Sequence, residues 1–287
     1  MSAAPETETA VAAPSRPARR TIIVRHPLVI RITHWVNVLG LSVMLMSGLQ
    51  IFNAHPALDW GNISTFEHPF LSMTAMMGAD GKPVGVTTVF GHSFNTTGVL
   101  GLSTSEGRPT ARGFPDWATI PSYQDLATGR VWHFFFAWVL VLNGLVYLFY
   151  ALASRHVWRD LIPSGAQLRH IGRDILDHAR FRFPKGEAAK HYNVLQKLAY
   201  LGVIFVVLPL IVLAGLCLSP QVGADYPWLV ALFGGRQSAR TIHFLCATAL
   251  VLFVLVHVFM VLVSGVWNNL RSMITGRYVI EGEAHER

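Results

Sequence analysis

Four histidines lie inside long apolar stretches of the chain, where an ionisable side chain is costly and therefore usually functional. They are His34, His133, His243 and His257. His243 and His257 are 14 residues apart within one stretch, which on an α-helix is a rotation about 40° short of four full turns and a rise of about 21 Å. Both side chains therefore face the same way at different depths, and the spacing indicates two cofactors rather than one metal ion.

Each of these two histidines has a partner at its own depth. His133 and His243 both lie near the starts of apolar stretches that we expect to enter the membrane from the same side, whereas the stretch that begins near His34 runs the opposite way and brings His34 level with His257. Two neutral imidazoles that face each other are natural axial ligands of a six-coordinate haem. A hydrogen-bonded core histidine would explain any one of the four, but it would have to be invoked four times. We therefore predict two haem b groups.

Small residues and one arginine fit the same arrangement. Gly48 follows His34 by 14 residues and Gly144 follows His133 by 11, so each lies close to the helical face of its histidine and leaves room for a porphyrin. Glycine is also common in contacts between membrane helices, which is the alternative explanation. Arg31 is placed to pair with a haem propionate, although snorkelling to lipid phosphate would explain it as well.

The bulk composition excludes several other classes of protein. The 287-residue chain is 52% hydrophobic and only 14% charged, whereas soluble domains have about 25% charged residues. Its two cysteines form no CxxC pair, which argues against a disulfide framework, a thiolate zinc site and covalently attached c-type haem. The net charge of +7 comes from basic residues beside apolar stretches, so we expect contact with membrane lipid and none with nucleic acid.

Four stretches reach the length of about 20 apolar residues that a helix needs to cross a membrane. They are residues 29–52, 132–153, 198–218 and 241–266. The predicted fold class is all-α, an integral membrane four-helix bundle with a long periplasmic loop between its first and second helices. The turn-rich composition of that loop predicts a small cap on the membrane surface.

The distribution of basic residues predicts the orientation. The face with both termini has 17 Lys and Arg residues and the other face has 6, so the positive-inside rule places both termini in the cytoplasm, as for a multi-pass protein of the bacterial inner membrane. The predicted organisation is a disordered cytoplasmic tail (1–28), a transmembrane di-haem domain (29–266) with a periplasmic loop (53–131) and a cytoplasmic loop (154–197), and a cytoplasmic C-terminal tail (267–287).

Several motifs resemble one known family. The stretch Arg31-Ile32-Thr33-His34-Trp35, the pair Ser47-Gly48 and the 14-residue separation of His243 from His257 resemble the four-helix cytochrome b subunits of nickel-iron hydrogenases, formate dehydrogenases and thiosulfate reductases. The resemblance covers all four helices and implies that the four histidines are ligands of two haems. The loop at residues 53–131 is longer than expected for the hydrogenase and formate subunits, so the identity of the partner enzyme stays open.

The resemblance also implies a quinone site. Tyr192-Asn193-x-x-Gln196-Lys197 is similar to a segment of that family that lies beside the cytoplasmic-side haem. Asn193 and Gln196 are three residues apart, so at a helix start both amides can hydrogen-bond one quinone carbonyl. An Asn cap followed by helix-starting Gln and Lys is the alternative.

These observations predict a di-haem b-type cytochrome that carries electrons between quinone and a periplasmic oxidoreductase subunit, which the resemblance implies to contain molybdopterin. The chain is expected to be an electron-transfer subunit rather than an enzyme that converts a substrate by itself, because it has no Gly-rich nucleotide loop, thiolate cluster or catalytic carboxylate pair. The alternative is a haem-free transporter that uses the histidines for protons or a transition metal. A transporter should show broken helices around a midplane site, and continuous helices are expected here.

Overall fold

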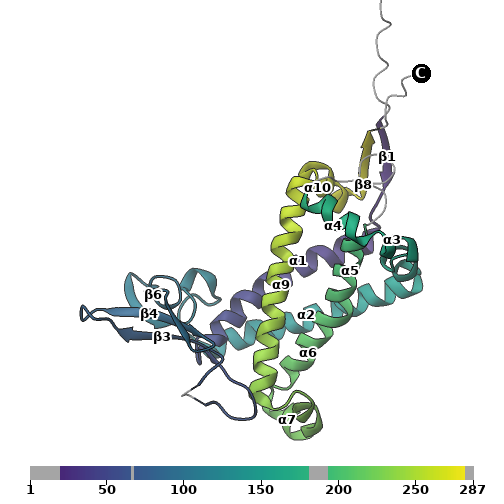
Figure 1. Cartoon of the computed structure of the whole chain (residues 1–287). Coiled ribbons are helices and arrows are strands. Elements are labelled where there is room, and N and C mark those ends of the chain that lie inside the picture. The colour runs from purple at the N-terminus through teal and green to yellow at the C-terminus, as the bar shows by residue number, and fades with distance from the viewer. Residues whose placement is uncertain (1–19, 66–67, 181–192, 282–287) are drawn as a thin grey trace, which may run out of the picture.

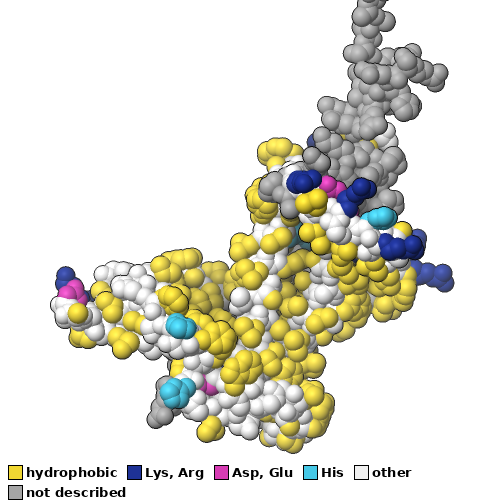
Figure 2. All heavy atoms as spheres, viewed as in Figure 1, with side chains coloured by type: hydrophobic (Ala, Val, Ile, Leu, Met, Phe, Trp, Pro, Cys, Tyr) yellow, Lys and Arg dark blue, Asp and Glu magenta, His cyan; other side chains and the backbone are white. Residues whose placement is uncertain are grey.

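Four long apolar helices form the body of the protein. The structure is a computed structural model that describes residues 20–65, 68–180 and 193–281. The helices that are long and apolar enough to cross a membrane are α1 (Leu28–Phe52), α2 (Leu126–Ala153), a third span (Val194–Leu216) and α9 (Arg236–Val263) (Figure 1). The predicted four-helix membrane bundle is therefore confirmed. Many of its apolar side chains are exposed (Figure 2), as expected where lipid is the solvent.

Three of the spans begin earlier than the apolar pattern predicted. The helices start at Leu126, Val194 and Arg236, whereas the pattern placed the starts at residues 132, 198 and 241. Apolar composition locates the crossing of the hydrocarbon core, but a helix continues until its backbone groups find other partners. Asp125 supplies such partners for α2, because its side chain accepts hydrogen bonds from two backbone N–H groups of the first turn.

The third span is not a single regular helix. It consists of α5 (Val194–Gly202), one turn of π-helix named η4 (Val203–Val207) and α6 (Leu208–Leu216). Pro209 has no backbone N–H and cannot bond to the carbonyl four residues earlier, which favours a local change of helical winding. The span is nevertheless unbroken from Val194 to Leu216, as the expectation of continuous helices requires, although its winding is not uniform.

The spans pack as two adjacent pairs. α1 lies along α2 and α6 lies along α9. Between α1 and α2 the Asn143 amide donates at 2.8 Å to the carbonyl of Thr33 and at 2.8 Å to the side chain of Asn37. Interhelical hydrogen bonds of this kind hold membrane helices together where there is no hydrophobic driving force between them. A cluster that includes Ile211, Cys246 and Leu250 fills the contact between α6 and α9.

The long connection between α1 and α2 is a small β-rich unit. One antiparallel sheet has the order β2 (Ala57–Leu58), β3 (Leu71–Met77), β4 (Pro83–Val89) and β5 (His92–Asn95), and β6 (Gly101–Ser105) pairs with β7 (Arg108–Arg112). We call this unit, which lies between Phe52 and Leu126, the loop domain. The side of the bundle from which it projects is called the loop face (Figure 1). The sequence predicted a cap at this place but not its strands.

A buried arginine joins the loop domain to the start of α2. Arg112 is 2% exposed, and its guanidinium donates to the carbonyls of Phe114 and Ser122 and to the hydroxyls of Ser105 and Thr119. The chain then passes η1 (Asp116–Ala118) and enters α2. On the same face α7 (Pro220–Asp225) and α8 (Pro227–Leu232) connect the third span to α9. Arg112 therefore holds together the segment between β6 and the start of α2.

The other side of the bundle, which we call the terminal face, contains short helices. After α2 come η2 (Val157–Leu161), α3 (Gly165–Arg169) and α4 (Ile171–Ala179), and α9 is followed by α10 (Val266–Thr275). Gly265 has a φ of 108°, which lets the chain turn sharply between α9 and α10. This face therefore has its own layer of helices.

Both ends of the described chain meet at the terminal face. β1 (Arg20–Val24) pairs antiparallel with β8 (Arg277–Glu281). The Asn268 side chain donates to the backbone carbonyl of Val279 and accepts from its backbone N–H. The sequence placed residues 20–24 in a disordered tail, which is wrong for these residues because a strand from the other end of the chain pairs with them. Residues 1–19, 181–192 and 282–287, with Tyr192 of the motif above, lie outside the described residues.

Candidate functional site

The structure brings the four histidines of the membrane helices together in two pairs. His133 of α2 and His243 of α9 have ring centres 6.2 Å apart, and we call them the loop-side pair. His34 of α1 and His257 of α9 have ring centres 6.3 Å apart and form the terminal-side pair. These are the pairs that the sequence predicted, while the role of the four residues as ligands stays a prediction.

The separation within each pair fits one metal ion between two imidazoles. A metal-bound imidazole nitrogen lies about 2.0 Å from the metal and the ring centre about 1.1 Å further away, so two rings on opposite sides of an ion have centres about 6.2 Å apart. The observed values are 6.2 and 6.3 Å. Both pairs therefore have the spacing that the two axial ligands of a haem require.

Hydrogen bonds orient the rings of the loop-side pair. Nδ1 of His133 lies 3.2 Å from the carbonyl oxygen of Met44 and 3.1 Å from the hydroxyl of Ser47, and Nδ1 of His243 lies 2.8 Å from the carbonyl oxygen of Ile211. A carbonyl only accepts hydrogen bonds, so each Nδ1 has the proton and Nε2 has the lone pair. This is the usual arrangement of a histidine that binds a metal through Nε2.

The terminal-side pair is held by ring contacts. His257 stacks on Phe253 with an interplanar angle of 19°, and His34 makes an edge contact with Trp35 at 5.4 Å between ring centres. Nδ1 of His34 is buried and has no hydrogen-bond partner among the described residues. The two pairs are therefore alike in spacing but differ in how the protein positions the imidazoles.

Two glycines make room for the loop-side rings. A Cβ on Gly48 would lie 3.3 Å from Cε1 of His133, and a Cβ on Gly215 would lie 3.0 Å from Cε1 of His243. Gly48 was predicted from its spacing, but Gly215 was missed because it lies in the third span, which has none of the four histidines. Gly144, also predicted, has open space where a Cβ would be, which leaves room beside α2.

Arg31 lies at the terminal face on the same helix as His34. Its Nε is buried without a partner among the described residues, and a Cβ on Gly276 would lie 2.6 Å from its Nη1. Gly276 therefore allows the guanidinium to lie against the turn between α10 and β8. The unpaired Nε leaves a donor for an anionic group, so pairing with a propionate stays a prediction.

Asn193 and Gln196 form the cap of α5. The Asn193 side chain accepts at 2.9 Å from the Gln196 backbone, and the Gln196 side chain accepts at 3.3 Å from the Asn193 backbone. This reciprocal capping box is the structural alternative that the sequence left open. Both interactions use the amide oxygens, so a quinone contact at these residues depends on their NH₂ groups.

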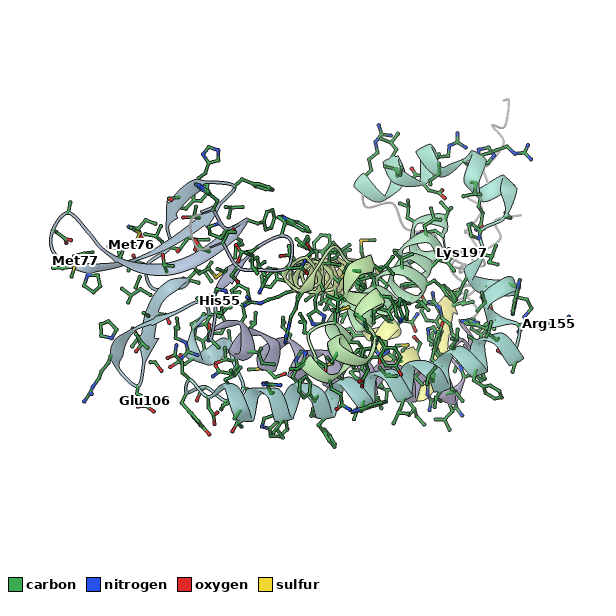
Figure 3. All side chains as sticks on the ribbon, turned by 90° about the horizontal axis from the view of Figure 1, so that it is seen from below. His55, Met76, Met77, Glu106, Arg155 and Lys197 are labelled. Atoms are coloured by element: carbon green, nitrogen blue, oxygen red, sulfur yellow. The ribbon has the colours of Figure 1, made fainter. Side chains whose placement is uncertain are left out.

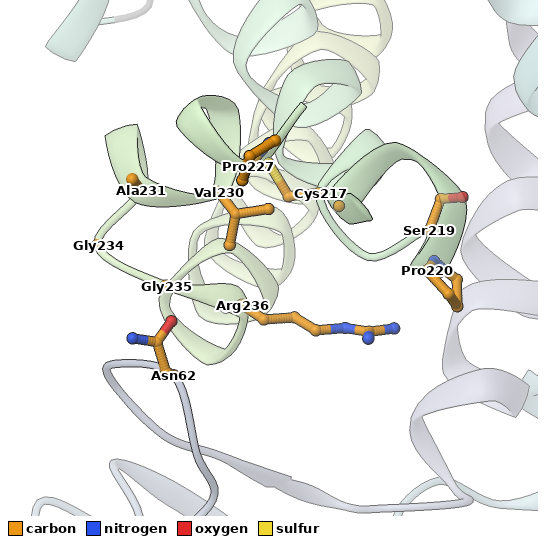
Figure 4. Close-up of a pocket in the computed structure, with 11 residues that line it drawn as sticks. Asn62, Cys217, Ser219, Pro220, Pro227, Val230, Ala231, Gly234, Gly235 and Arg236 are labelled. Carbon is orange, nitrogen blue, oxygen red and sulfur yellow. The ribbon is translucent and has the colours of Figure 1, made fainter. Parts of the chain in front are cut away.

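The described part of the chain contains no further cluster of metal-ligating side chains. Within the described part of the chain, no group of three or more His, Cys, Asp and Glu side chains could hold a metal ion. A pocket of about 590 Å³ at the loop face lies between the end of the third span and the start of α9, and Arg236 crosses it (Figure 4). Its lining includes Cys217 but none of the four histidines. Cys217 and Cys246 are free and buried, as packing residues are.

Comparison with known proteins agrees with this geometry. Residues 84–276, which include three of the four histidines, match the family described as prokaryotic cytochrome b561. The chain belongs to this family. It is also 31% identical over 251 residues to the putative protein-methionine-sulfoxide reductase subunit YedZ1 of Azospira oryzae, in an alignment that covers 88% of this chain and 96% of that relative. No solved structure matches.

Membership of the cytochrome b561 family fixes the general role. The protein is a multi-pass membrane cytochrome with haem b, and it serves electron transfer as a subunit of an oxidoreductase. The histidine pairs are suited to this cofactor, because each offers two imidazoles at the right separation. The haem-free transporter is therefore the weaker interpretation of the same histidines.

Proposed function

We propose that this cytochrome b561 holds two haem b groups and conducts electrons between a quinone at the terminal face and a partner oxidoreductase at the loop face. The observation that supports this most directly is the presence of two histidine pairs at two depths. His243 and His257 are separated by about 21 Å along α9, and the hydrocarbon core is about 30 Å thick. Two such cofactors would cover most of the distance across the membrane.

His133 and His243 would hold one haem through their Nε2 atoms, and His34 and His257 would hold the other. When bound, haem b supplies reversible one-electron oxidation and reduction of its iron. The protein fixes the imidazoles and excludes water with the apolar walls of the bundle. Substrate chemistry then belongs to the partner.

Quinone exchange is assigned to the terminal face. Asn193 and Gln196 lie at the start of α5, on the terminal face. Of the two histidine pairs, His34 and His257 lie nearer to this face. A quinone carbonyl only accepts hydrogen bonds, so contacts with it would come from the NH₂ groups of these side chains, whose oxygens accept in the capping box. Proton uptake and release would take place on the same side.

The loop domain is assigned to the partner. The 17 basic residues of the terminal face, against 6 on the loop face, support an orientation with the termini in the cytoplasm and the loop domain in the periplasm of a bacterial inner membrane. The resemblance to subunits of molybdopterin enzymes favours a molybdopterin-containing partner, and the name of the Azospira relative favours one that reduces methionine sulfoxide in proteins.

Haem content and histidine variants test the proposal. The purified protein should show b-type bands in a reduced-minus-oxidised spectrum and two haems per chain. His133→Ala and His34→Ala should each remove one haem and leave the other, because each residue belongs to a different pair.

His92→Ala is the matched control, because His92 is an exposed histidine of the loop domain. It should retain both haems. Loss of the same haem signal in the His133 and His34 variants would contradict the pairing, and purified protein without a Soret band would favour the transporter instead.

A further inference from the structure

Three of the four histidines follow an arginine by three residues. The pairs are Arg31 and His34, Arg130 and His133, and Arg240 and His243. Three residues on a helix correspond to a rise of about 4.5 Å and a rotation of about 300°. Each arginine therefore lies about one turn closer to the membrane surface than its histidine, on a neighbouring part of the helix.

Arg130 and Arg240 at the loop face have the same spacing from a histidine, but their surroundings differ. Arg130 of α2 is exposed, and its guanidinium lies 5.5 Å from the ring centre of the exposed Phe134. Arg240 of α9 is half-buried, and its guanidinium lies 5.5 Å from the ring centre of the buried Phe52. Arg130 thus faces outward, whereas Arg240, one helical turn from His243, is packed against Phe52 and bonds to the loop domain.

Arg240 has fewer partners than its guanidinium can bind. One of its five N–H groups donates to the backbone carbonyl of His55, and among the described residues it makes no ion pair. Asp59 is close enough to act on it electrostatically, but Oδ1 of Asp59 accepts from the backbone and the hydroxyl of Thr65, both at 3.2 Å. Donors of Arg240 therefore remain for another anion.

Two residues near Arg240, His55 and Asp59, belong to the loop domain. Asp59 is 3% exposed, and its backbone carbonyl accepts at 2.6 Å from the hydroxyl of Thr241, the residue after Arg240. Burial lowers the pKa of His55, Arg240 lowers it further, and Asp59 opposes them. A neutral His55 adds no positive charge beside Arg240.

We infer that Arg240 binds a propionate carboxylate of the haem held by His133 and His243, and that Arg130 does not. The inference rests on the proposed function, because it needs a haem in the loop-side pair. An arginine fork matches a carboxylate and binds it through two parallel hydrogen bonds. Since His55 and Asp59 lie in the loop domain, Arg240 would also connect this haem to the proposed docking unit.

The expected electrostatic effect has a definite sign. Reduction adds one electron to the haem, and a nearby cation stabilises the added negative charge. Removal of the Arg240 charge should therefore lower the midpoint potential of the loop-side haem. We expect at least a tenfold shift in the one-electron reduction equilibrium, which corresponds to about 59 mV.

Spectroelectrochemical titration of the purified full-length protein tests this inference. Arg240→Gln should lower the potential of one haem and leave the other unchanged. Arg130→Gln, the matched control with the same spacing from a histidine of the same pair, should leave both potentials unchanged. Arg240→Lys keeps the charge and should retain most of the wild-type potential.

The other possible outcomes also either support or contradict the inference. Loss of the loop-side haem in Arg240→Gln but not in Arg240→Lys would also support it, because the charge would then be what holds the propionate. Equal loss in both variants, unchanged potentials in Arg240→Gln, or an equal shift in Arg130→Gln would overturn it. A wild-type protein without two haems would instead overturn the proposed function.

Discussion

At the scale of single residues, the two histidine pairs differ in the hydrogen bonds of Nδ1. In the loop-side pair both Nδ1 atoms bond to backbone carbonyls, whereas Nδ1 of His34 is buried without a partner among the described residues. A carbonyl that accepts from Nδ1–H makes the other nitrogen a stronger donor to a metal. We therefore expect the two proposed haems to have different midpoint potentials, which would favour one direction of electron flow.

The quinone proposal is tested by substitutions that preserve the helix cap. Asn193→Asp and Gln196→Glu keep the oxygens that accept the capping hydrogen bonds but replace the NH₂ donors. Both haems should stay bound, and their reduction by a quinol analogue in stopped-flow measurements should slow by about threefold to tenfold, since one neutral hydrogen bond contributes about 0.5 to 1.5 kcal/mol.

Ser164→Asp is the control for these substitutions. Ser164 caps α3 with its own capping box on the same face, so the variant adds a carboxylate to a cap without removing an amide. Quinol exchange at the wild-type rate in both Asn193→Asp and Gln196→Glu would place the quinone elsewhere. Loss of haem would show that these residues are only structural.

At the scale of elements, the start of α2 determines where His133 lies. Asp125 caps the helix with bonds to the backbone of Ala127 and Thr128, and the Thr128 hydroxyl donates to the same carboxylate at 2.6 Å. His133 lies two turns further along. The position of this histidine in the membrane is therefore set by a polar cap outside it.

The Asp125 cap predicts a pH-dependent stability. The hydrogen bonds from Thr128 hold the pKa of Asp125 below its ordinary value of 3.8. A depressed folded-state pKa stabilises the protein above the ordinary value, and this contribution is lost as the pH falls through the lower folded-state pKa. Asp125→Ala should therefore melt at a lower temperature than wild type at pH 7, and the difference should shrink below pH 3.8.

Thermal unfolding followed by circular dichroism measures this difference. Asp125→Asn is the control, because asparagine caps helices about as well as aspartate but does not titrate. Its melting temperature at pH 7 should lie between those of wild type and Asp125→Ala, because asparagine keeps one accepting oxygen but not the charge. A difference between wild type and Asp125→Ala that stays constant with pH would show that the charged carboxylate is not the cap.

At the scale of the whole molecule, the two faces of the bundle have different structures. The loop domain projects from one face, while β1, β8 and the short helices cover the other (Figures 1 and 3). At the end of β3 the side chains of Met76 and Met77 are 57% and 73% exposed. Exposed apolar groups on a projecting hairpin are typical of surfaces that bind another protein.

This surface gives a test of partner docking. Met76→Ser combined with Met77→Ser should reduce the rate of electron exchange between the haems and the co-purified partner by about fivefold or more, because interface hot spots exceed about 1 kcal/mol. Haem content and exchange with a quinol analogue should not change. The measurement is the rate of haem absorbance change after addition of the partner's substrate.

Ile22→Thr is the matched control, because Ile22 is 63% exposed but lies in β1 at the terminal face. It should leave exchange with the partner unchanged. If the methionine variant also exchanged electrons normally, the hairpin would not be part of the docking surface.

The sequence alone determined the number of spans and the pairing of the histidines. Both follow from local periodicities, since 20 apolar residues cross the membrane and 14 residues bring a side chain back to nearly the same face. His34, His133, His243 and His257 could therefore be placed at two depths without knowledge of the helix packing.

Only the tertiary structure decided which neighbours the histidines have. The spacing from histidine is the same for Arg130 and Arg240, yet one faces outward and the other is packed against Phe52. In the same way, Gly215 is next to His243 because α6 lies along α9. β1 pairs with a strand more than 250 residues away. Such contacts join distant parts of the chain, so no local period in the sequence reveals them.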